Sequence, residues 1–236
     1  MDHPFVPFEV SHLSALAVTF VTSLVLVAIA QTWSNRRLAA TIRWVLAALL
    51  ITNWLLWLAL LYNMGWLSPA TILPANLCDW ATIVVIITLI RPNQRTYELA
   101  YFWGFGGTLQ ALLTPDLAAD FPDLRFLIFF ALHGGVIASV LVLTLGMRMR
   151  PWLSSIPRVI AWSLVYLVTA IVVNAVFGTN FGYLMTKPTQ PSLLDFLAPW
   201  PYYIGEMMLL GGGFIVLFYS PFLIWDRLAR NRNASS

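Results

Sequence analysis

The sequence has 236 residues, of which 60% are hydrophobic and 10% are charged, whereas roughly 25% of residues are charged in soluble domains. This composition excludes an ordinary soluble domain and indicates an all-α integral membrane protein, predicted as one transmembrane helical-bundle domain over residues 1–236. The formal net charge is +3, but the basic residues lie between apolar runs, which favours a role in membrane topology over nucleic-acid binding. The single cysteine excludes an internal disulfide.

Seven apolar runs have the roughly 17 to 25 residues that a membrane-spanning helix needs. The stretch "AIAQ" at the end of the first run resembles a signal-peptidase site. The arginines follow that run instead of preceding it, so the first span is predicted to be retained. The seven predicted spans cover residues 11–31, 43–63, 72–90, 97–114, 124–147, 157–178 and 203–227.

Basic residues fall in alternate connections between these spans, and this asymmetry predicts the orientation of the chain. Cytoplasmic connections carry an excess of Lys and Arg, so we expect an N-outside, C-inside protein of the plasma membrane or bacterial inner membrane. The long outer segment 179–202 is predicted to lie over the helix ends as a lid or interfacial loop. Eleven of the thirteen basic residues fall on the predicted cytoplasmic side: Arg36, Arg37, Arg43, Arg91, Arg95, Arg148, Arg150, Arg158, Arg227, Arg230 and Arg232.

Polar side chains recur in the outer half of the predicted bundle, on five different spans. With a rise of about 1.5 Å per residue, Cys78 is expected roughly 9 Å and His133 roughly 14 Å below the outer boundary. A polar group in hydrocarbon is costly unless it meets a partner or water. The inner stretches, such as "VIAWSLVYLVTAIVV" in the sixth span, are predicted to be apolar packing or lipid-facing surface. We therefore expect one polar cavity open to the outer leaflet, lined by Cys78, Gln110, His133, Asn174 and Glu206.

Three residues of this outer region have chemistry of their own, and each also has a structural interpretation. Cys78 is either an inert small hydrophobic residue or a nucleophile. Asp79 is either part of a site or the partner in a helix–helix hydrogen bond. His133, flanked by Gly134 and Gly135, is either bonded to a neighbouring helix or a proton carrier. The residues alone leave these alternatives open.

Arg125 departs from the charge asymmetry, because it lies at the predicted outer end of the fifth span. It is expected either to pair with a nearby aspartate (Asp116, Asp120 or Asp123) or to hold a lipid phosphate, for which a guanidinium is well suited. Lys187 and Asn180, in the outer segment, are candidates for binding the same headgroup. Membrane phospholipids are therefore the predicted partners.

Several other functions lack their sequence signatures. Three histidines and one cysteine do not provide the spaced ligands of a zinc site. The sequence contains no GxSxG motif, no Walker A motif and no surface pattern of alternating basic and aromatic residues. We therefore predict no metal, no other cofactor and no nucleic-acid partner, and the sequence does not indicate an oligomeric state.

Five blocks within roughly residues 70–205 carry a resemblance to a known family. They are "LPANLCDW" (73–80), "YFWGFGGTLQALLTPDL" (101–117), "FPDLRFLIFFALHGGVI" (121–137), "NFGYLMTKP" (180–188) and "LLDFLAPWPYYI" (193–204). In these blocks the chain resembles the YwaF-type family of bacterial integral membrane proteins. That family is similar to an animal transmembrane acyltransferase that remodels ether phospholipids and in which a membrane-embedded cysteine is the proposed acyl carrier.

The resemblance implies that Cys78 is the nucleophile and that His133 is the base. The chain departs from the family pattern at Asn76, where bacterial relatives often have histidine. In such a mechanism Asp79 orients His133, as the acid does in a catalytic triad. Gln110, Asn174 or a protonated Glu206 donates to the oxyanion.

Two functions therefore remain in view. The first is a membrane-embedded phospholipid acyltransferase or acyl hydrolase. The alternative is a non-enzymatic binder or transporter of a lipid or small molecule, with Asp79, His133 and Glu206 as ligand or proton sites in the same cavity. The apolar inner halves of the spans argue against a transport pathway.

Overall fold

The computed structural model describes residues 4–32 and 36–234, and these residues form helices and loops with no β-strand among them. The predicted all-α class is confirmed. Asp2 and His3 lie outside the described residues, as do the side chains of Arg36 and Arg232. The α-helices are α1 (Val10–Thr32), α2 (Arg36–Met64), α3 (Pro69–Ile72), α4 (Leu77–Ile90), α5 (Gln94–Trp103), α6 (Leu109–Leu113), α7 (Leu124–Leu141), α8 (Ser155–Phe177) and α9 (Tyr202–Ala234), joined by the π-helical segments η1 (Gly104–Thr108) and η2 (Val142–Gly146) and the 3₁₀ turns η3 (Phe181–Tyr183) and η4 (Leu193–Phe196).

Five helical segments in the described part of the chain are long and apolar enough to cross a membrane. They correspond to the first, second, fifth, sixth and seventh predicted spans. The protein is therefore a multi-pass membrane protein, whereas its orientation stays a prediction. The five segments are Val10–Gln31, Arg37–Met64, Leu124–Gly146, Ser155–Phe177 and Tyr202–Asn231.

The third and fourth predicted spans differ from the helices observed. Helix α4 has 14 residues, which gives about 21 Å of helix against a hydrocarbon core of about 30 Å. It begins at residue 77 instead of 72, because α3 ends before Pro74 and the residue before a proline avoids the helical region. The fourth span is a composite of α5, η1 and α6 over residues 94–113 that changes to π-helical geometry at Gly104.

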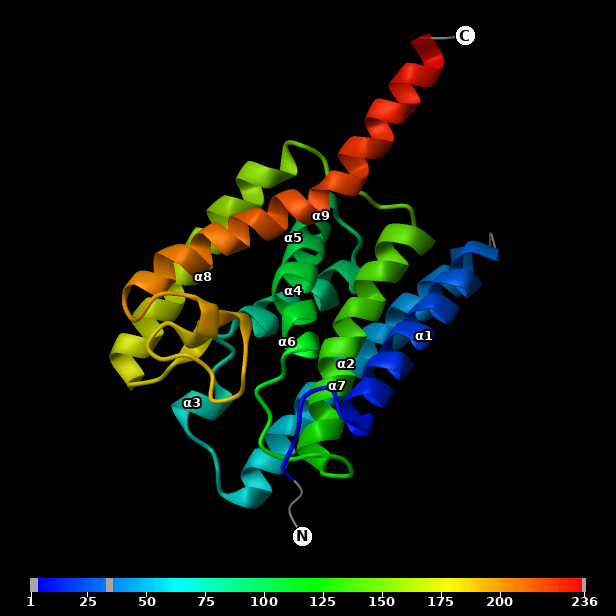
Figure 1. Cartoon of the computed structure of the whole chain (residues 1–236). Coiled ribbons are helices and arrows are strands. Elements are labelled where there is room, and N and C mark those ends of the chain that lie inside the picture. Colours follow the sequence, from blue (N-terminus) through cyan, green and yellow to red (C-terminus); the bar gives the residue numbers. More distant parts are fainter. Residues whose placement is uncertain (1–3, 33–35, 235–236) are drawn as a thin grey trace.

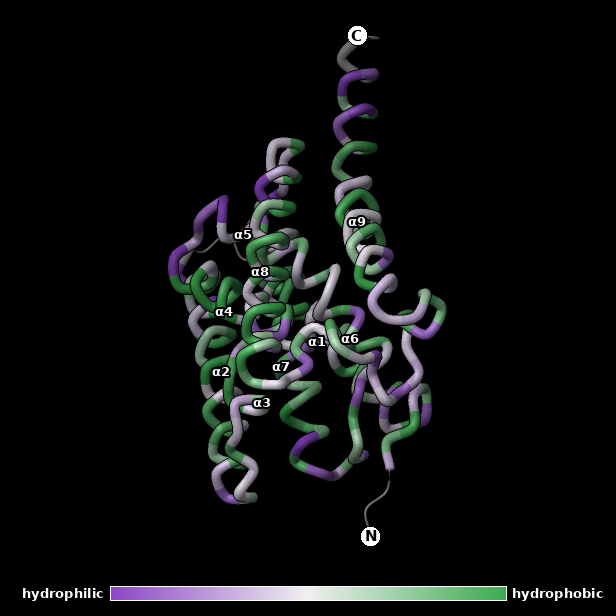
Figure 2. Tube along the Cα trace, turned by 90° about the vertical axis from the view of Figure 1, so that its left-hand side faces the viewer, coloured by the Kyte–Doolittle hydropathy of each residue, from purple (hydrophilic) through white to green (hydrophobic). Residues whose placement is uncertain are grey.

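Helix α7 lies beside α1 and α2, whereas α8 and α9 lie on the far side of α4 and α5 (Figure 1). Two glycines allow the close approach of α7. A Cβ atom on Gly134 would lie 2.8 Å from the Thr19 hydroxyl of α1, and one on Gly135 would lie 2.9 Å from Leu50 of α2. Such small residues let membrane helices pack with their backbones close together. The final turns of α9 are hydrophilic and extend beyond the other helices (Figure 2).

At the arginine-rich end of the bundle, ion pairs connect α5, α8, α9 and the loop before α8. Arg158 of α8 binds both carboxylate oxygens of Glu98 of α5, at 2.7 and 2.8 Å. Arg150 binds both oxygens of Asp226 in α9, at 2.7 and 2.9 Å, and stacks 4.7 Å from the Trp152 ring. The hydrogen bonds that Arg150 donates to Asp226 raise the pKa of Arg150 above its usual value. Both pairs are the bidentate kind that holds geometry best.

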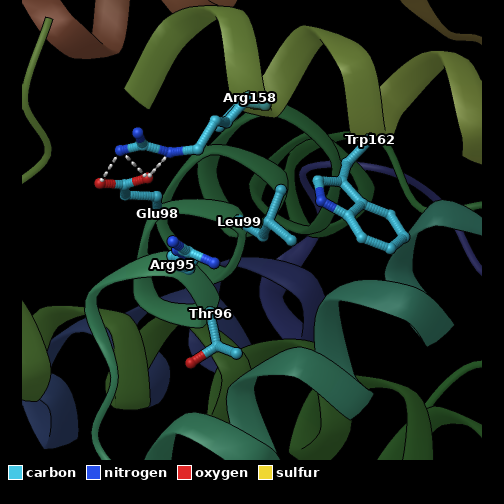
Figure 3. Close-up of a pocket in the computed structure, with 7 residues that line it drawn as sticks. Arg95, Thr96, Glu98, Leu99, Arg158 and Trp162 are labelled. Atoms are coloured by element: carbon cyan, nitrogen blue, oxygen red, sulfur yellow. Dashed lines mark hydrogen bonds and ion pairs between the residues drawn. The ribbon is translucent and has the colours of Figure 1, made fainter. Parts of the chain in front are cut away.

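The Glu98–Arg158 pair lines a hollow of about 280 Å³ between α5 and α8. Figure 3 shows the guanidinium of Arg158 reaching over Glu98, with Arg95 below and Trp162 to one side. The Glu98 side chain is 1% exposed and that of Arg158 is 43% exposed. The buried negative charge of Glu98 is therefore balanced by the Arg158 guanidinium and by a hydrogen bond from the Gln94 amide, 3.1 Å away.

Replacement of Glu98 by glutamine is expected to lower the free energy of unfolding by about 1.5–3 kcal/mol, the usual net value of a charged hydrogen bond. The glutamine side chain has nearly the same volume as glutamate, but it leaves the Arg158 guanidinium without a negatively charged partner. Thermal unfolding in detergent micelles measures the effect. Glu9→Gln, at an exposed position, is the matched control and should change stability little. Equal midpoints for the two variants would contradict the prediction.

Candidate thiol site

The candidate site is built on the first turn of α4, and the local sequence determines where that turn begins. Leu73 has an extended backbone, with φ −72° and ψ 129°, directly before Pro74. Asn76 is the N-cap residue, and the Asp79 carboxylate accepts a hydrogen bond from the Asn76 backbone N–H at 2.9 Å. An acid at this position satisfies a free donor and complements the helix dipole. Asp79 thus stabilises the turn that carries Cys78.

The Cys78 thiol occupies the second residue of α4 and is half-buried. The backbone N–H groups of Asp79 and Trp80 bond to the Asn76 carbonyl, at 3.1 and 3.3 Å. The Leu77 N–H faces the Tyr166 hydroxyl oxygen, and no described residue is bonded to the N–H of Cys78. The thiol therefore lies at the positive end of a helix, on a residue whose own backbone N–H has no partner among the described residues.

The segment 179–202 folds back across the end of α8 (Figure 1) and is bonded to this first turn of α4. The Gly182 N–H donates to the Asn76 side-chain carbonyl at 3.2 Å. The Tyr183 hydroxyl donates to the Asp116 carboxylate at 3.2 Å, and burial raises the pKa of Tyr183. The Tyr203 hydroxyl donates to the Tyr183 carbonyl. The predicted position of this segment at the helix ends is confirmed.

Asn174 and Asn180, both predicted to bind substrate, shape the start of this segment. The buried Asn174 amide accepts hydrogen bonds from the Thr179 hydroxyl, at 2.8 Å, and from the Phe181 N–H, at 2.7 Å. Asn180 accepts hydrogen bonds from two backbone N–H groups and donates two to Thr186. Each side chain has a structural role in the loop, and substrate binding by either one stays a prediction.

Lys187 and Glu206, two further predicted substrate ligands, bond to the backbone at the end of the same segment. The Lys187 ammonium donates to the Leu197 carbonyl at 2.7 Å and lies 5.6 Å from the centre of the Tyr203 ring. The exposed Glu206 carboxylate accepts from the Ala198 N–H at 2.7 Å. These two bonds connect opposite charges to the stretch that leads into α9.

His133 is buried in α7 and bonds within its own helix. Its Nδ1 donates to the Phe129 carbonyl at 2.8 Å, and its ring stacks on the Phe129 ring with centroids 4.0 Å apart. No hydrogen bond joins the imidazole to Cys78 or Asp79 in the described part of the chain. The role of His133 as a base stays a prediction.

Arg125 takes the ion-pair alternative expected for it. Its guanidinium binds both oxygens of Asp123, at 2.7 and 2.9 Å, and lies 5.7 Å from the centre of the Trp66 ring. Its side-chain hydrogen bonds hold the pKa of Asp123 below the usual range. Gln110 lies half-buried on α6, and no described residue bonds to its side-chain amide. Of Arg125 and Gln110, both predicted substrate ligands, Gln110 is the one whose side-chain amide has no bonding partner among the described residues.

Tyr166 was not among the predicted site residues. The stretch around it in α8 was expected to be apolar packing or lipid-facing surface, and the Tyr166 ring does pack in an apolar cluster. Its side chain also lies within electrostatic range of both Cys78 and Asp79. A buried phenol in a mostly apolar run is the sequence signal, because its hydroxyl needs a polar environment.

An all-helical, multi-pass membrane protein with a half-buried thiol at the start of a short inner helix is the class that the fold and site define. The chain belongs to the TMEM164 family, because the sequence model of that family matches residues 7–219. This match supports the expected relationship to a membrane protein family but not the YwaF-type or bacterial assignment. Neither the curated proteins nor the solved structures contained a match to the chain.

Gly182 should be more sensitive to a side chain than Gly178, although both have positive φ, +65° and +64°. A Cβ atom at Gly182 would lie 2.6 Å from the Tyr166 hydroxyl, whereas nothing lies within 4 Å of one at Gly178. Gly178→Ala is expected to lower the free energy of unfolding by about 1–2 kcal/mol, the cost of the left-handed conformation. Gly182→Ala should cost more.

Thermal unfolding of the two alanine variants, each with and without Tyr166→Phe, measures this difference. Removal of the hydroxyl should relieve part of the Gly182→Ala penalty and none of the Gly178→Ala penalty. Equal penalties in all backgrounds would show that the hydroxyl does not lie against Gly182.

Proposed function

We propose that this chain is a membrane-embedded phospholipid acyltransferase or acyl hydrolase that uses Cys78 as its nucleophile. The observation that carries the proposal is the position of the thiol. It is half-buried, at the second residue of α4, whose backbone N–H has no partner among the described residues. A helix N-terminus favours negative charge, both on a thiolate and on the oxyanion formed when that thiolate attacks an ester.

Membership of the TMEM164 family and the resemblance to an animal transmembrane acyltransferase with a membrane-embedded cysteine support this chemistry. The thiolate attacks the ester carbonyl of a phospholipid, and a lysolipid leaves. A second lysolipid hydroxyl or a water molecule then accepts the acyl group from the thioester. The choice between these two acceptors distinguishes a transferase from a hydrolase.

Membrane phospholipids are the proposed partners, and the proposed location is the plasma membrane or bacterial inner membrane, with the N-terminus outside. The arginine-rich end of the bundle would then face the cytoplasm, and Cys78 would lie near the outer leaflet. Because α4 begins at Leu77, the thiol lies only about 1.5 Å along its helix, instead of the expected 9 Å. In the proposed orientation the thiol would meet ester carbonyls just beneath the headgroups.

Two groups compete for the role of proton acceptor. The family resemblance implies His133. Asp79 is the nearer candidate, because its carboxylate interacts electrostatically with the Cys78 thiol. A base that takes the thiol proton in the transition state is typically worth about 10²–10⁴ in rate. Substitution of each group therefore decides between them.

A second function is favoured by the absence of a preformed thiol–imidazole pair among the described residues. In this alternative the same outer region binds a lipid or small molecule without chemistry. Such a binder would be stabilised by its ligand and would form no product. Its affinity should then depend on Asp79 more than on Cys78.

Cys78→Ala is expected to abolish formation of an acyl-enzyme. Wild-type protein in liposomes should gain one acyl mass in intact-protein mass spectrometry after incubation with phospholipid, and a lysolipid should remove it. Asp79→Asn and His133→Ala identify the base, since the true base variant should slow acylation about 10²-fold or more. Turnover that survives in Cys78→Ala, or the absence of any adduct and any turnover across phospholipid classes, would overturn the proposal.

A further inference from the structure

The Tyr166 hydroxyl is a buried polar group without a hydrogen-bond partner in the described part of the chain. The residue is 8% exposed, and its ring packs edge-on against the Trp80 ring, with centroids 5.5 Å apart. A buried polar atom that no protein group satisfies costs free energy and calls for an explanation. In a functional site, one explanation is a ligand atom that the hydroxyl is placed to meet.

Three chain segments meet at this hydroxyl. It lies against Gly182, as the 2.6 Å distance to a Cβ atom built there shows. The Leu77 backbone lies beside its oxygen, and Cys78 and Asp79 are the charged or ionisable groups within its electrostatic range. The hydroxyl therefore lies at the first turn of α4, where the N–H of Cys78 also has no partner among the described residues.

Several other polar side chains around this turn are occupied. The Tyr183 hydroxyl donates to Asp116, and Lys187 donates to the Leu197 carbonyl. The Asp79 carboxylate accepts from Asn76 and has no proton to donate when ionised. The Tyr166 hydroxyl, by contrast, is buried and available to donate to a bound molecule.

We propose that Tyr166 is a catalytic residue of the thiol site: its hydroxyl donates a hydrogen bond to the acyl carbonyl oxygen as that oxygen becomes negatively charged. This inference rests on the proposed acyl-transfer function and adds a side-chain donor to the backbone N–H of Cys78. Two converging donors are the usual composition of an oxyanion hole.

The step balances as follows. The Cys78 thiol gives its proton to the base, and its sulfur forms a bond to the ester carbonyl carbon. The two electrons of the carbonyl π bond move onto the oxygen, which Tyr166 and the Cys78 N–H stabilise. The carbonyl re-forms, the bond from carbon to the glycerol oxygen breaks, and that oxygen takes the proton from the base. The products are a thioester and a lysolipid, with no net redox change.

Tyr166→Phe is the informative variant, because it keeps the ring on Trp80 and removes only the unpartnered hydroxyl. Its thermal stability should equal or exceed that of the wild type. Acylation of Cys78 by phospholipid in liposomes should slow by about 10²-fold or more, the usual loss for one oxyanion donor. Alkylation of Cys78 by iodoacetamide forms no oxyanion and should change less than about two-fold.

Tyr101→Phe is the matched control. The Tyr101 hydroxyl donates to the Phe218 carbonyl at 3.0 Å, so its removal should lower the unfolding midpoint and leave the acylation rate of Cys78 unchanged. The two variants remove the same atom from buried tyrosines. Tyr166→Phe should slow acylation without loss of stability, and Tyr101→Phe should lower stability without a change in the acylation rate.

The outcomes separate this inference from the proposed function. Equal acylation rates for wild type and Tyr166→Phe would overturn the role of Tyr166 and leave the acyltransferase proposal intact. A parallel fall in acylation and alkylation would also overturn it, because the hydroxyl would then act on the thiol. If phospholipid gives no adduct with the wild type, acylation of Cys78 by p-nitrophenyl butyrate decides. If Tyr166→Phe slows acylation by this ester, the result supports Tyr166 as the donor but not the phospholipid substrate. If wild type and Tyr166→Phe react at the same rate, the donor role is overturned.

Discussion

In a membrane a helix can start only where its first N–H groups are bonded or covered by protein, because hydrocarbon offers them no partner. Helix α4 starts inside the bundle, at Asn76, and the arrangement around it meets this constraint. Asp79 bonds back to the Asn76 N–H, and the loop at Gly182 bonds to the Asn76 side chain. The Leu77 N–H faces the Tyr166 hydroxyl, and among the described residues the Cys78 N–H has no partner beneath that cover. This is the polar position on which the proposed chemistry depends.

The opposite end of the protein holds the helices that surround this site in position. The bidentate Glu98–Arg158 and Arg150–Asp226 pairs connect α5, α8 and α9, although α9 is otherwise mostly exposed. Tyr166 is two helical turns from Arg158 along α8. A pair that fixes the axial position of α8 therefore also fixes the height at which the Tyr166 hydroxyl meets the start of α4.

The length of the apolar runs predicted the five long spans, because a run of twenty or more apolar residues has few alternatives to a membrane helix. The same rule overestimated α4, since the apolar composition of residues 72–76 concealed the break at Pro74. Depth along a helix is also readable from sequence, whereas rotation about its axis is not. Each residue turns the helix by about 100°, so His133 was expected near Cys78 from depth alone. The described bond and ring contact of His133 are with Phe129 of its own helix, and Tyr166, from a mostly apolar run, lies within electrostatic range of the thiol.

The surroundings of the thiol favour a substrate that comes from within the bilayer over one that comes from water. The segment 179–202 covers one end of the site with a network of hydrogen bonds that includes those of Tyr183, Asn174 and Lys187. Beside the site, the residues packed around Tyr166 are Leu184 of this segment and apolar side chains of α4, α8 and α9, and α8 and α9 expose most of their apolar surface. In the proposed function an acyl chain would lie along such a surface at no cost in polar desolvation, and its ester would meet the Tyr166 hydroxyl and the Cys78 N–H at the start of α4.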